Sequence, residues 1–280
     1  MATIRKVSSI LLPLLLPMLL VASSERRVTH ERLQGALWIQ TSAEYQMTTT
    51  QIYGLAKEKL DAALRDPSWT AALEQEVDYS QLPPAVIVDV DETVLDNSAF
   101  QARLVRNDSD YQSDMWRQWV LESKARATPG ALDFAKYASE KGVMIFYVTN
   151  RKHDVENATM RNLQHLEFPL QGGEKQVLLR GEQEDWGPDK SSRRRYLAKV
   201  YRILLLVGDD LNDFVSGAMT NPEQRIEVAT KFRSYWGEKW ILIPNPLYGS
   251  WEGAIYDFEF AATDKEKLGR KYKRLETLED

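Results

Sequence analysis

A short apolar run that ends in two carboxylates constrains this chain more than any other feature. Val86–Val88 follows the pair Pro83–Pro84, and so short a β-branched run predicts a buried strand of a parallel sheet. Asp89 and Asp91 come directly after it, at the carboxyl end where open α/β sheets bind their ligands. Because residues i and i+2 of an extended segment point to the same side, the two carboxylates converge on one small volume.

Two carboxylates this close repel each other unless a cation or a proton compensates. Mg²⁺ suits such a site, because it takes oxygen ligands and is often held by one or two carboxylates plus a substrate phosphate. An acidic turn after a strand is the simpler alternative for this stretch. A calcium-binding EF-hand loop is excluded, because Val94 stands at the sixth position from Asp89, where that loop needs glycine.

Four more apolar runs predict strands of the same sheet. They alternate with helical segments, which predicts an α/β fold with a doubly wound parallel sheet. The runs are residues 143–148, 177–179, 203–207 and 240–243.

The run Asp89-Val-Asp91-Glu92-Thr93 matches the DxDxT signature of haloacid-dehalogenase-like phosphatases, and its continuation through Leu95-Asp96-Asn97-Ser98 resembles the bacterial class C acid phosphatases of the lipoprotein e type. The resemblance implies a Rossmann-like sheet with a helical cap. It implies magnesium-dependent hydrolysis of phosphomonoesters, including nucleoside 5′-monophosphates, through an aspartyl-phosphate. Asp89 would attack phosphorus, and Asp91 would serve as general acid and then base while its backbone carbonyl joins the metal site.

Thr149, Asn150 and Arg151 follow the second strand and match the family's second motif. A hydroxyl at a strand's carboxyl end can donate to a phosphoryl oxygen, and Asn150 and Arg151 are candidate substrate contacts. In the alternative, Thr149 only begins a turn, and Asp154 caps a helix over residues 156–166.

Lys190 follows the third strand, and Gly208-Asp209-Asp210-Leu211-Asn212-Asp213 follows the fourth. By resemblance, Lys190 neutralises charge near the aspartates, Asp209 is a direct metal ligand, and Asp213 orients the site from behind it. Taken alone, Lys190 before Arg193–Arg195 is a solvated helix start, and the three arginines are expected on the surface. Asp210 and Asn212 are expected to cap the next helix.

Three aromatic residues are candidate contacts for a nucleotide base. Tyr248 and Trp251 lie beyond the fifth strand in a loop rich in proline and glycine, a composition that favours a fixed turn, and Phe100 follows Asp89 by eleven residues. The resemblance implies that aromatics in these regions contact the substrate. In the alternative, Tyr248 and Trp251 only cover the edge of the sheet.

The expected cap comes from residues 28–78 and 99–128. Residues 30–73 have helical spacing with a break at Pro67, where Trp38 and Tyr45 are expected to be packing aromatics. In this superfamily, an insertion after the first strand commonly caps the site. The charged tail from Thr263 onward predicts a solvated helix without a special role.

The composition excludes some partners. The chain has 280 residues with a net charge of -5, so a nucleic acid polymer has no electrostatic attraction to it. The expected partner is a small phosphomonoester, and the sequence leaves open a homodimer and a phosphotransferase activity in place of hydrolysis. A non-catalytic storage or binding protein, as in some plant relatives, is a further alternative.

Residues 1–23 have the charged, apolar and small-residue pattern of a secretory signal peptide, with an uncleaved membrane anchor as the alternative. The chain contains no cysteine, so it lacks the acylated cysteine of the lipoprotein e pattern. We therefore expect export to the periplasm or the medium without a permanent anchor. Residues 24–280 are expected to form the phosphatase domain.

Overall fold

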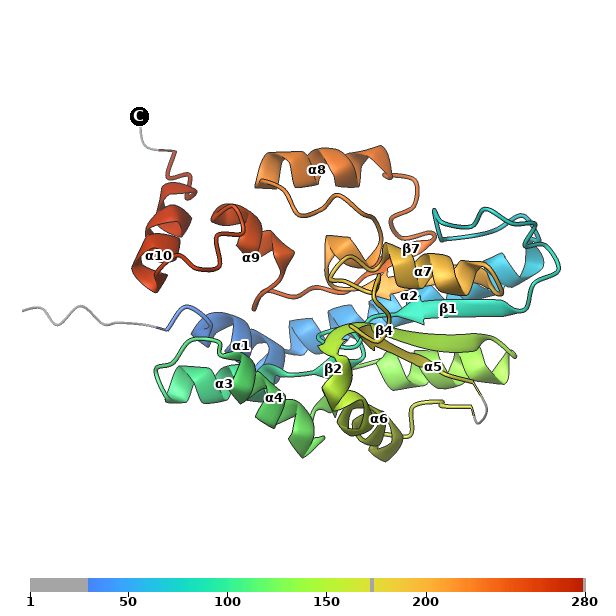
Figure 1. The fold of residues 1–280 in the computed structure, drawn as a ribbon, viewed down its shortest axis with the longest axis horizontal. Helices are drawn as coiled ribbons and strands as arrows, with labels where there is room; N and C mark the ends of the chain where they lie inside the picture. The colour runs from blue at the N-terminus through green and yellow to red at the C-terminus, as the bar shows by residue number, and fades with distance from the viewer. Residues whose placement is uncertain (1–29, 172–173, 279–280) are drawn as a thin grey trace, which may run out of the picture.

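A five-stranded parallel sheet runs through the computed structural model, which describes residues 30–171 and 174–278 (Figure 1). The strands stand in the order β5-β4-β1-β6-β7, and every neighbouring pair is parallel. The predicted α/β fold is confirmed. The bounds of these strands are Pro84–Val88 (β1), Met144–Lys152 (β4), Val177–Arg180 (β5), Arg202–Gly208 (β6) and Trp240–Leu242 (β7).

Both faces of the sheet are covered, as the apolar strands require. Val86 and Val88 of β1 belong to one core cluster with residues of α2 (Ala43–Arg65), α5 (Ala131–Glu140) and α6 (Glu156–His165). Ala85 and Ile87 point to the opposite face, where α7 (Ser191–Ala198) and α8 (Pro222–Lys231) pack. The sheet is thus wound on both sides.

The N-terminal helical segment divides into two helices with different positions. α1 (Leu33–Thr41) and α2 meet at Ser42, whose hydroxyl oxygen accepts a hydrogen bond from Tyr45 N at 3.0 Å and caps α2. α2 ends at Arg65, next to the predicted break at Pro67. It packs on the sheet as a layer of the core, so this part of the expected cap is not over the site.

The remaining elements lie beyond the carboxyl ends of the strands. In Figure 1, α1 with α3 and α4 lies on one side of this end, and α9 and α10 lie on the other. α3 and α4 correspond to the expected cap segment 99–128, and they lie in the chain between β2 and β3, which pair as a small two-stranded ribbon. The bounds are Leu95–Asp96 (β2), Ser98–Arg106 (α3), Ser113–Glu122 (α4), Arg126–Ala127 (β3), Ser250–Ile255 (α9) and Asp264–Lys273 (α10).

Two short 3₁₀ helices follow β4 and β6, namely His153–Val155 (η1) and Leu211–Asp213 (η2). Asp210 caps η2, as expected. The expectation that Asp154 caps the helix from residue 156 is wrong, because α6 has no side-chain cap and Asp154 accepts a hydrogen bond from Arg117 Nε at 2.7 Å.

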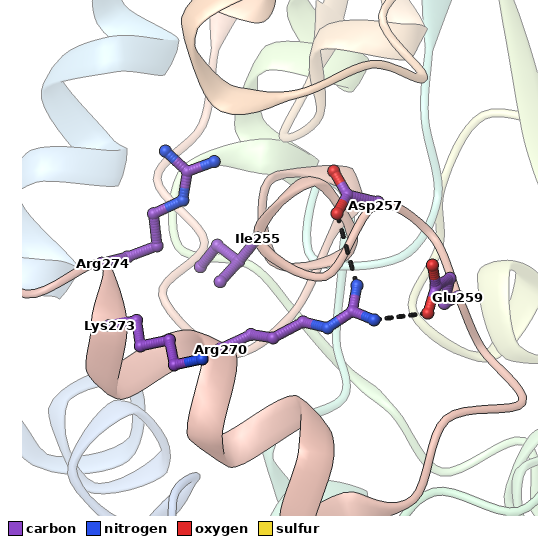
Figure 2. Close-up of a pocket in the computed structure, with 6 residues that line it drawn as sticks. All are labelled: Ile255, Asp257, Glu259, Arg270, Lys273 and Arg274. Atoms are coloured by element: carbon purple, nitrogen blue, oxygen red, sulfur yellow. Dashed lines mark hydrogen bonds and ion pairs between the residues drawn. The ribbon is translucent and has the colours of Figure 1, made fainter.

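Figure 2 shows a surface hollow between α9 and α10. Arg270 crosses it and donates to Asp257 at 3.3 Å and to Glu259 at 2.5 Å. These contacts fix the C-terminal helix to the turn after α9. Among the described residues, no helix is both long enough and apolar enough to cross a bilayer. The predicted signal peptide lies outside the described residues.

Candidate active site

A cleft of about 710 Å³ opens at the carboxyl end of the sheet. Its floor is made by side chains directly after β1 and β6, at the end of β4 and directly before α7, and its walls come from α4, the α3–α4 loop, α9 and α10. The charged tail forms α10, which has no buried residues, as predicted, and Lys267 and Lys271 of this helix lie in the wall of the cleft. The floor residues are Asp89, Asp91, Asn150, Arg151, Lys190, Asp209 and Asp213.

Asp89 lies at the centre of the floor, directly after β1, and is 8% exposed. Its Oδ1 accepts a hydrogen bond from Lys190 Nζ, which also donates to Asp213 Oδ1 at 2.6 Å. Burial raises the pKa of Asp89 to about 7; Lys190 opposes this rise, and the charges of Asp213 and Asp91 add to it. Burial alone would lower the pKa of Lys190, but the two carboxylates raise it, so the lysine stays charged. Lys190 is therefore a buried counter-charge and not a solvated helix start.

Asp89, Asp209 and Asp213 each offer a carboxylate oxygen, and these oxygens lie within 4.8 Å of one another. Burial raises the pKa of Asp209 well above its usual value, and repulsion from Asp213 and Asp89 adds to it. Lys190 is the cation in contact with this cluster in the described part of the chain. Three converging carboxylates with one lysine leave negative charge that a hard divalent cation fits.

The hydrogen bonds separate the roles of the last two acids. Oδ2 of Asp213 accepts from the backbone N–H groups of Asp209 and Asp210 at 3.1 and 2.9 Å, and its Oδ1 is bound by Lys190. Both oxygens of Asp213 thus accept hydrogen bonds from the protein, whereas a metal ligand needs a free oxygen. Asp209 accepts from Thr93 Oγ1 at 3.2 Å and from Asn245 Nδ2 at 2.8 Å, which fixes its carboxylate at the cleft floor.

Asp91 forms an ion pair with Arg151, whose Nη2 lies 2.7 Å from Asp91 Oδ1. Asn97 Nδ2 donates to the same oxygen at 2.9 Å. The guanidinium lies over the ring of Trp116, 5.7 Å from its centroid, and donates to Thr159 Oγ1 at 3.1 Å. Arg151 is buried and points into the cleft floor, beside the general acid expected from the sequence.

Thr149 and Asn150 belong to the last part of β4, which runs further than the sequence predicted. Thr149 is fully buried, and its hydroxyl oxygen accepts from Arg151 N at 3.1 Å. Both ends of the Asn150 amide are used by the protein: Oδ1 accepts from Arg193, and Nδ2 donates to the Pro188 carbonyl at 2.9 Å. Asn150 therefore holds the loop around Pro188 that leads to Lys190.

The three candidate stacking residues occupy different positions. Tyr248 lines the cleft, and its hydroxyl donates to the buried carboxylate of Glu92. Trp251 lies on α9, is 40% exposed, and is not among the residues that line the cleft. Phe100 is buried and packs edge-on against Trp116, with centroids 5.2 Å apart, so it supports the cleft wall from behind. These positions correct the expectation that Phe100 and Trp251 face a ligand.

Several residues of the site were not assigned a role from the sequence. Tyr111 and Trp116 line the cleft from the α3–α4 region. Glu92 has a left-handed backbone with φ 57°, which turns its side chain inward to accept from Asn97 N at 2.9 Å. A contact between residues 92 and 248 carries no sequence signal, because the two residues lie far apart in the chain.

The surface expectation for the arginines after Lys190 is wrong at two of three positions. Arg193 and Arg194 are fully buried, and Arg195 is exposed. Their hydrogen bonds run to the loops that carry the site residues. Charge alone predicted the surface, because the acceptors come from segments far away in the sequence.

A parallel sheet with two spaced aspartates after its central strand, a lysine bound to the first, and an acid pair after the neighbouring strand defines the haloacid-dehalogenase-like hydrolases. Comparison with known proteins gives the family. The profile described as HAD superfamily, subfamily IIIB (Acid phosphatase) matches residues 25–251. The chain belongs to this family of acid phosphatases and is a phosphoric monoester hydrolase.

Two solved structures are similar to this chain over most of its length. The class C acid phosphatase from Bacillus anthracis is 35% identical, with a TM-score of 0.77, over 89% of this chain and 98% of that one. The same enzyme with tungstate bound is 34% identical, with a TM-score of 0.78, over 90% and 99% of the two chains. This similarity supports the enzyme over the storage-protein alternative.

Proposed function

We propose that the chain is a magnesium-dependent acid phosphatase that hydrolyses phosphomonoesters, nucleoside 5′-monophosphates among them, through a phosphoryl group carried on Asp89. The observation that supports this most is the contact of Lys190 with Asp89 and Asp213 at the floor of the cleft. In this contact two carboxylates and a fixed cation share one small volume, an arrangement that suits phosphoryl transfer.

In the proposed reaction, Asp89 Oδ2 attacks phosphorus and forms an acyl phosphate while the P–O bond to the leaving group breaks. Asp91 gives its proton to the leaving oxygen. Asp91 then takes a proton from the water that attacks phosphorus in the second step, which releases phosphate and restores Asp89. Lys190 and Arg151 supply positive charge to the phosphoryl oxygens, and Thr149 supplies a hydroxyl donor.

Asp89, Asp209 and the backbone carbonyl of Asp91 are the proposed holders of Mg²⁺, with Asp213 behind them. The fit rests on the three clustered carboxylates. When bound, the cation would offset the repulsion between the carboxylates and the phosphoryl group. The Bacillus anthracis relative has been solved with tungstate bound, and tungstate is a tetrahedral oxyanion like phosphate.

The size and the aromatic walls of the cleft support a nucleotide as substrate. The cleft is far larger than a phosphate ion needs, and Tyr111, Trp116 and Tyr248 line it above the acids. Base stacking on such rings contributes about 1–3 kcal/mol per base and accepts every base. We therefore propose nucleoside monophosphates as a class, with slight discrimination among bases.

Trapping of the phosphoryl-enzyme tests the mechanism. Rapid acid quench of the enzyme during turnover should give a species heavier by one phosphoryl group, with the modification at Asp89. Transfer to water and to added alcohols is measured in the same experiment, since an alcohol that reaches the intermediate would give the phosphotransferase activity. Steady turnover without a modified species, at quench times shorter than one cycle, would contradict the covalent route.

We also propose that the protein is exported after cleavage near residue 23. The support is the sequence pattern of residues 1–23. N-terminal sequencing of the protein recovered from the periplasm and from the medium tests this. A mature protein that still begins at Met1 would contradict it.

A further inference from the structure

Three cationic side chains at the start of α7 reach residues near the carboxyl ends of β1, β4 and β6. Lys190, Arg193 and Arg194 are spaced i, i+3 and i+4, which places them on one face of the helix. All three are buried, whereas the next residue, Arg195, is exposed. A buried guanidinium is costly unless its donors are satisfied and its charge is compensated. The hydrogen-bond partners of the two arginines therefore indicate why these side chains are buried.

The guanidinium of Arg193 reaches the end of β4. Its Nη1 donates to the carbonyl oxygen of Thr149 at 2.5 Å, and its Nη2 donates to Asn150 Oδ1 at 2.7 Å. These bonds hold the backbone that presents the Thr149 hydroxyl and the Arg151 side chain. They act on the segment from behind, away from the cleft.

The same guanidinium also holds the loop that leads to Lys190. Nη2 of Arg193 donates to the carbonyl oxygen of Gly187 at 2.8 Å. The amide of Asn150 completes the link, because its Nδ2 donates to the Pro188 carbonyl at 2.9 Å. One buried side chain thus ties the end of β4, with Thr149 and Asn150, to the loop that leads to Lys190.

The two arginines differ in how their charge is compensated. Arg194 forms a buried ion pair with Glu74, with Nη2 and Oε1 2.7 Å apart, and donates to the carbonyl oxygen of Asp213 at 3.0 Å. Arg193 has neutral acceptors only among the described residues, and its Nε is buried without a partner. A buried charge without a carboxylate partner is a poor device for stability. Its three contacts with two active-site loops point to a functional reason.

We propose that Arg193 is a positioning residue for phosphoryl transfer, which sets the distance between the Thr149–Arg151 segment and Lys190. This inference rests on the proposed function, because Arg193 acts through residues assigned there to the phosphoryl group. A shift of about 1 Å in such groups can cost about 100-fold in rate. The effect of losing Arg193 therefore falls on turnover and on anion binding together.

The test begins with Arg193→Lys, which keeps the charge but cannot reach three acceptors with a planar fork. Turnover of p-nitrophenyl phosphate and inhibition by tungstate are measured on protein whose folded fraction is fixed by circular dichroism. We expect kcat/KM to fall about 100-fold and the inhibition constant for tungstate to rise at least tenfold. The matched control is Arg195→Lys on the exposed face of the same helix, which should stay within twofold of the parent.

Asn150→Ala removes the hydrogen bonds of the Asn150 amide with Arg193 and with the Pro188 carbonyl. Because Asn150 is exposed, this variant tests the inference if Arg193→Lys does not fold. We expect it to lose at least tenfold in kcat/KM with an unchanged melting temperature. The inference would be overturned if folded Arg193→Lys kept the kcat/KM and the tungstate inhibition of the parent. If Arg193→Lys does not fold, the same parent values in Asn150→Ala would overturn it.

A double variant separates positioning from general stability. If Arg193 acts through the Thr149 segment, the two substitutions affect the same step. The double variant Arg193→Lys, Thr149→Ala should then have a kcat/KM no more than about threefold below that of the less active single variant. Losses that multiply would overturn the inference. Full activity of Thr149→Ala alone would instead contradict the proposed function. An impaired Thr149→Ala with parent-like Arg193→Lys would contradict only the role of Arg193.

Discussion

Arg151 holds the carboxylate of Asp91 in a forked contact, with Nη2 2.7 Å from Oδ1 and Nε 3.1 Å from Oδ2. The guanidinium therefore binds both oxygens of the carboxyl group that, in the proposed reaction, gives a proton to the leaving group. A bound phosphoryl group is a competing acceptor for the guanidinium. Binding of substrate is therefore expected to draw Arg151 from Asp91 and free that carboxyl for proton transfer.

Arg151→Gln should lower kcat/KM by roughly 10- to 150-fold, since a hydrogen bond to a charged group contributes about 1.5–3 kcal/mol. The variant is assayed on p-nitrophenyl phosphate beside Arg117→Gln, whose side chain is half-exposed and pairs with Asp154 at the surface. An Arg151→Gln enzyme as active as its Arg117→Gln control would remove Arg151 from the phosphoryl site.

Asp89→Asn should fold and lose several orders of magnitude in turnover, because the amide cannot attack phosphorus. Stability should not suffer, since burial already disfavours the charged form of Asp89. Turnover and melting temperature are measured together with Asp114→Asn, an exposed acid of α4. Activity of Asp89→Asn within tenfold of the parent would exclude Asp89 as the nucleophile.

Magnesium should stabilise the protein more at pH 7 than at pH 5. The pKa of Asp89 is raised to about 7 by burial, against about 3.9 in an unfolded chain. Between these values the folded, metal-free protein holds more protons than the unfolded chain, so its free energy of unfolding falls as pH rises from about 4 to 7. Mg²⁺ requires the ionised carboxylates and opposes this fall.

At about 100 times its Kd, Mg²⁺ adds about 2.7 kcal/mol, which corresponds to roughly 5–10 °C for a protein of this size. Thermal scans at both pH values, with Mg²⁺ or with EDTA, measure this change in melting temperature. Asp209→Asn is the control, and its melting temperature should not respond to Mg²⁺. Activity should disappear in EDTA and return with Mg²⁺. Full activity in a chelated enzyme shown to be metal-free by elemental analysis would contradict the metal site.

Gly208→Ala should damage the metal site through packing alone. A methyl group at this position would lie 2.5 Å from Cβ of Asp213, so the acid must move. We expect a loss of about 1–3 kcal/mol in stability and weaker binding of Mg²⁺. Gly54→Ala in α2 is the control, because its added methyl group meets no atom within 4 Å and should be neutral or stabilising. Unchanged Mg²⁺ affinity in Gly208→Ala would argue against an orienting role for Asp213.

Tyr248→Ala should weaken use of AMP by about tenfold or more and affect p-nitrophenyl phosphate less, because stacking contributes about 1–3 kcal/mol per base. Trp251→Ala is the matched control, since its ring lies outside the cleft lining. Equal losses of Tyr248→Ala on both substrates would assign the ring to the protein's own packing. A larger loss from Trp251→Ala on AMP would contradict the placement of these two rings.

The sequence by itself determined the sheet and the acids at its edge. Buried strands can be recognised from short apolar runs in the local sequence. The carboxyl ends of parallel strands then lie at one edge of the sheet. Asp89 and Asp91 could therefore be assigned to this edge from the residues alone, and Lys190 and Asp209 could be added from the family resemblance. Their contacts in the cleft floor agree with that assignment.

Tertiary structure alone decided which side chains face the ligand and which hold the site from behind. Phe100 and Trp116 are both aromatic residues of the same region, yet the packing of α3 on α4 buries the first and leaves the second in the cleft wall. Arg193 and Arg195 have identical side chains on one helix, and only the neighbouring loops give Arg193 its acceptors. These outcomes depend on contacts between segments far apart in the chain, and no local pattern of residue types encodes them.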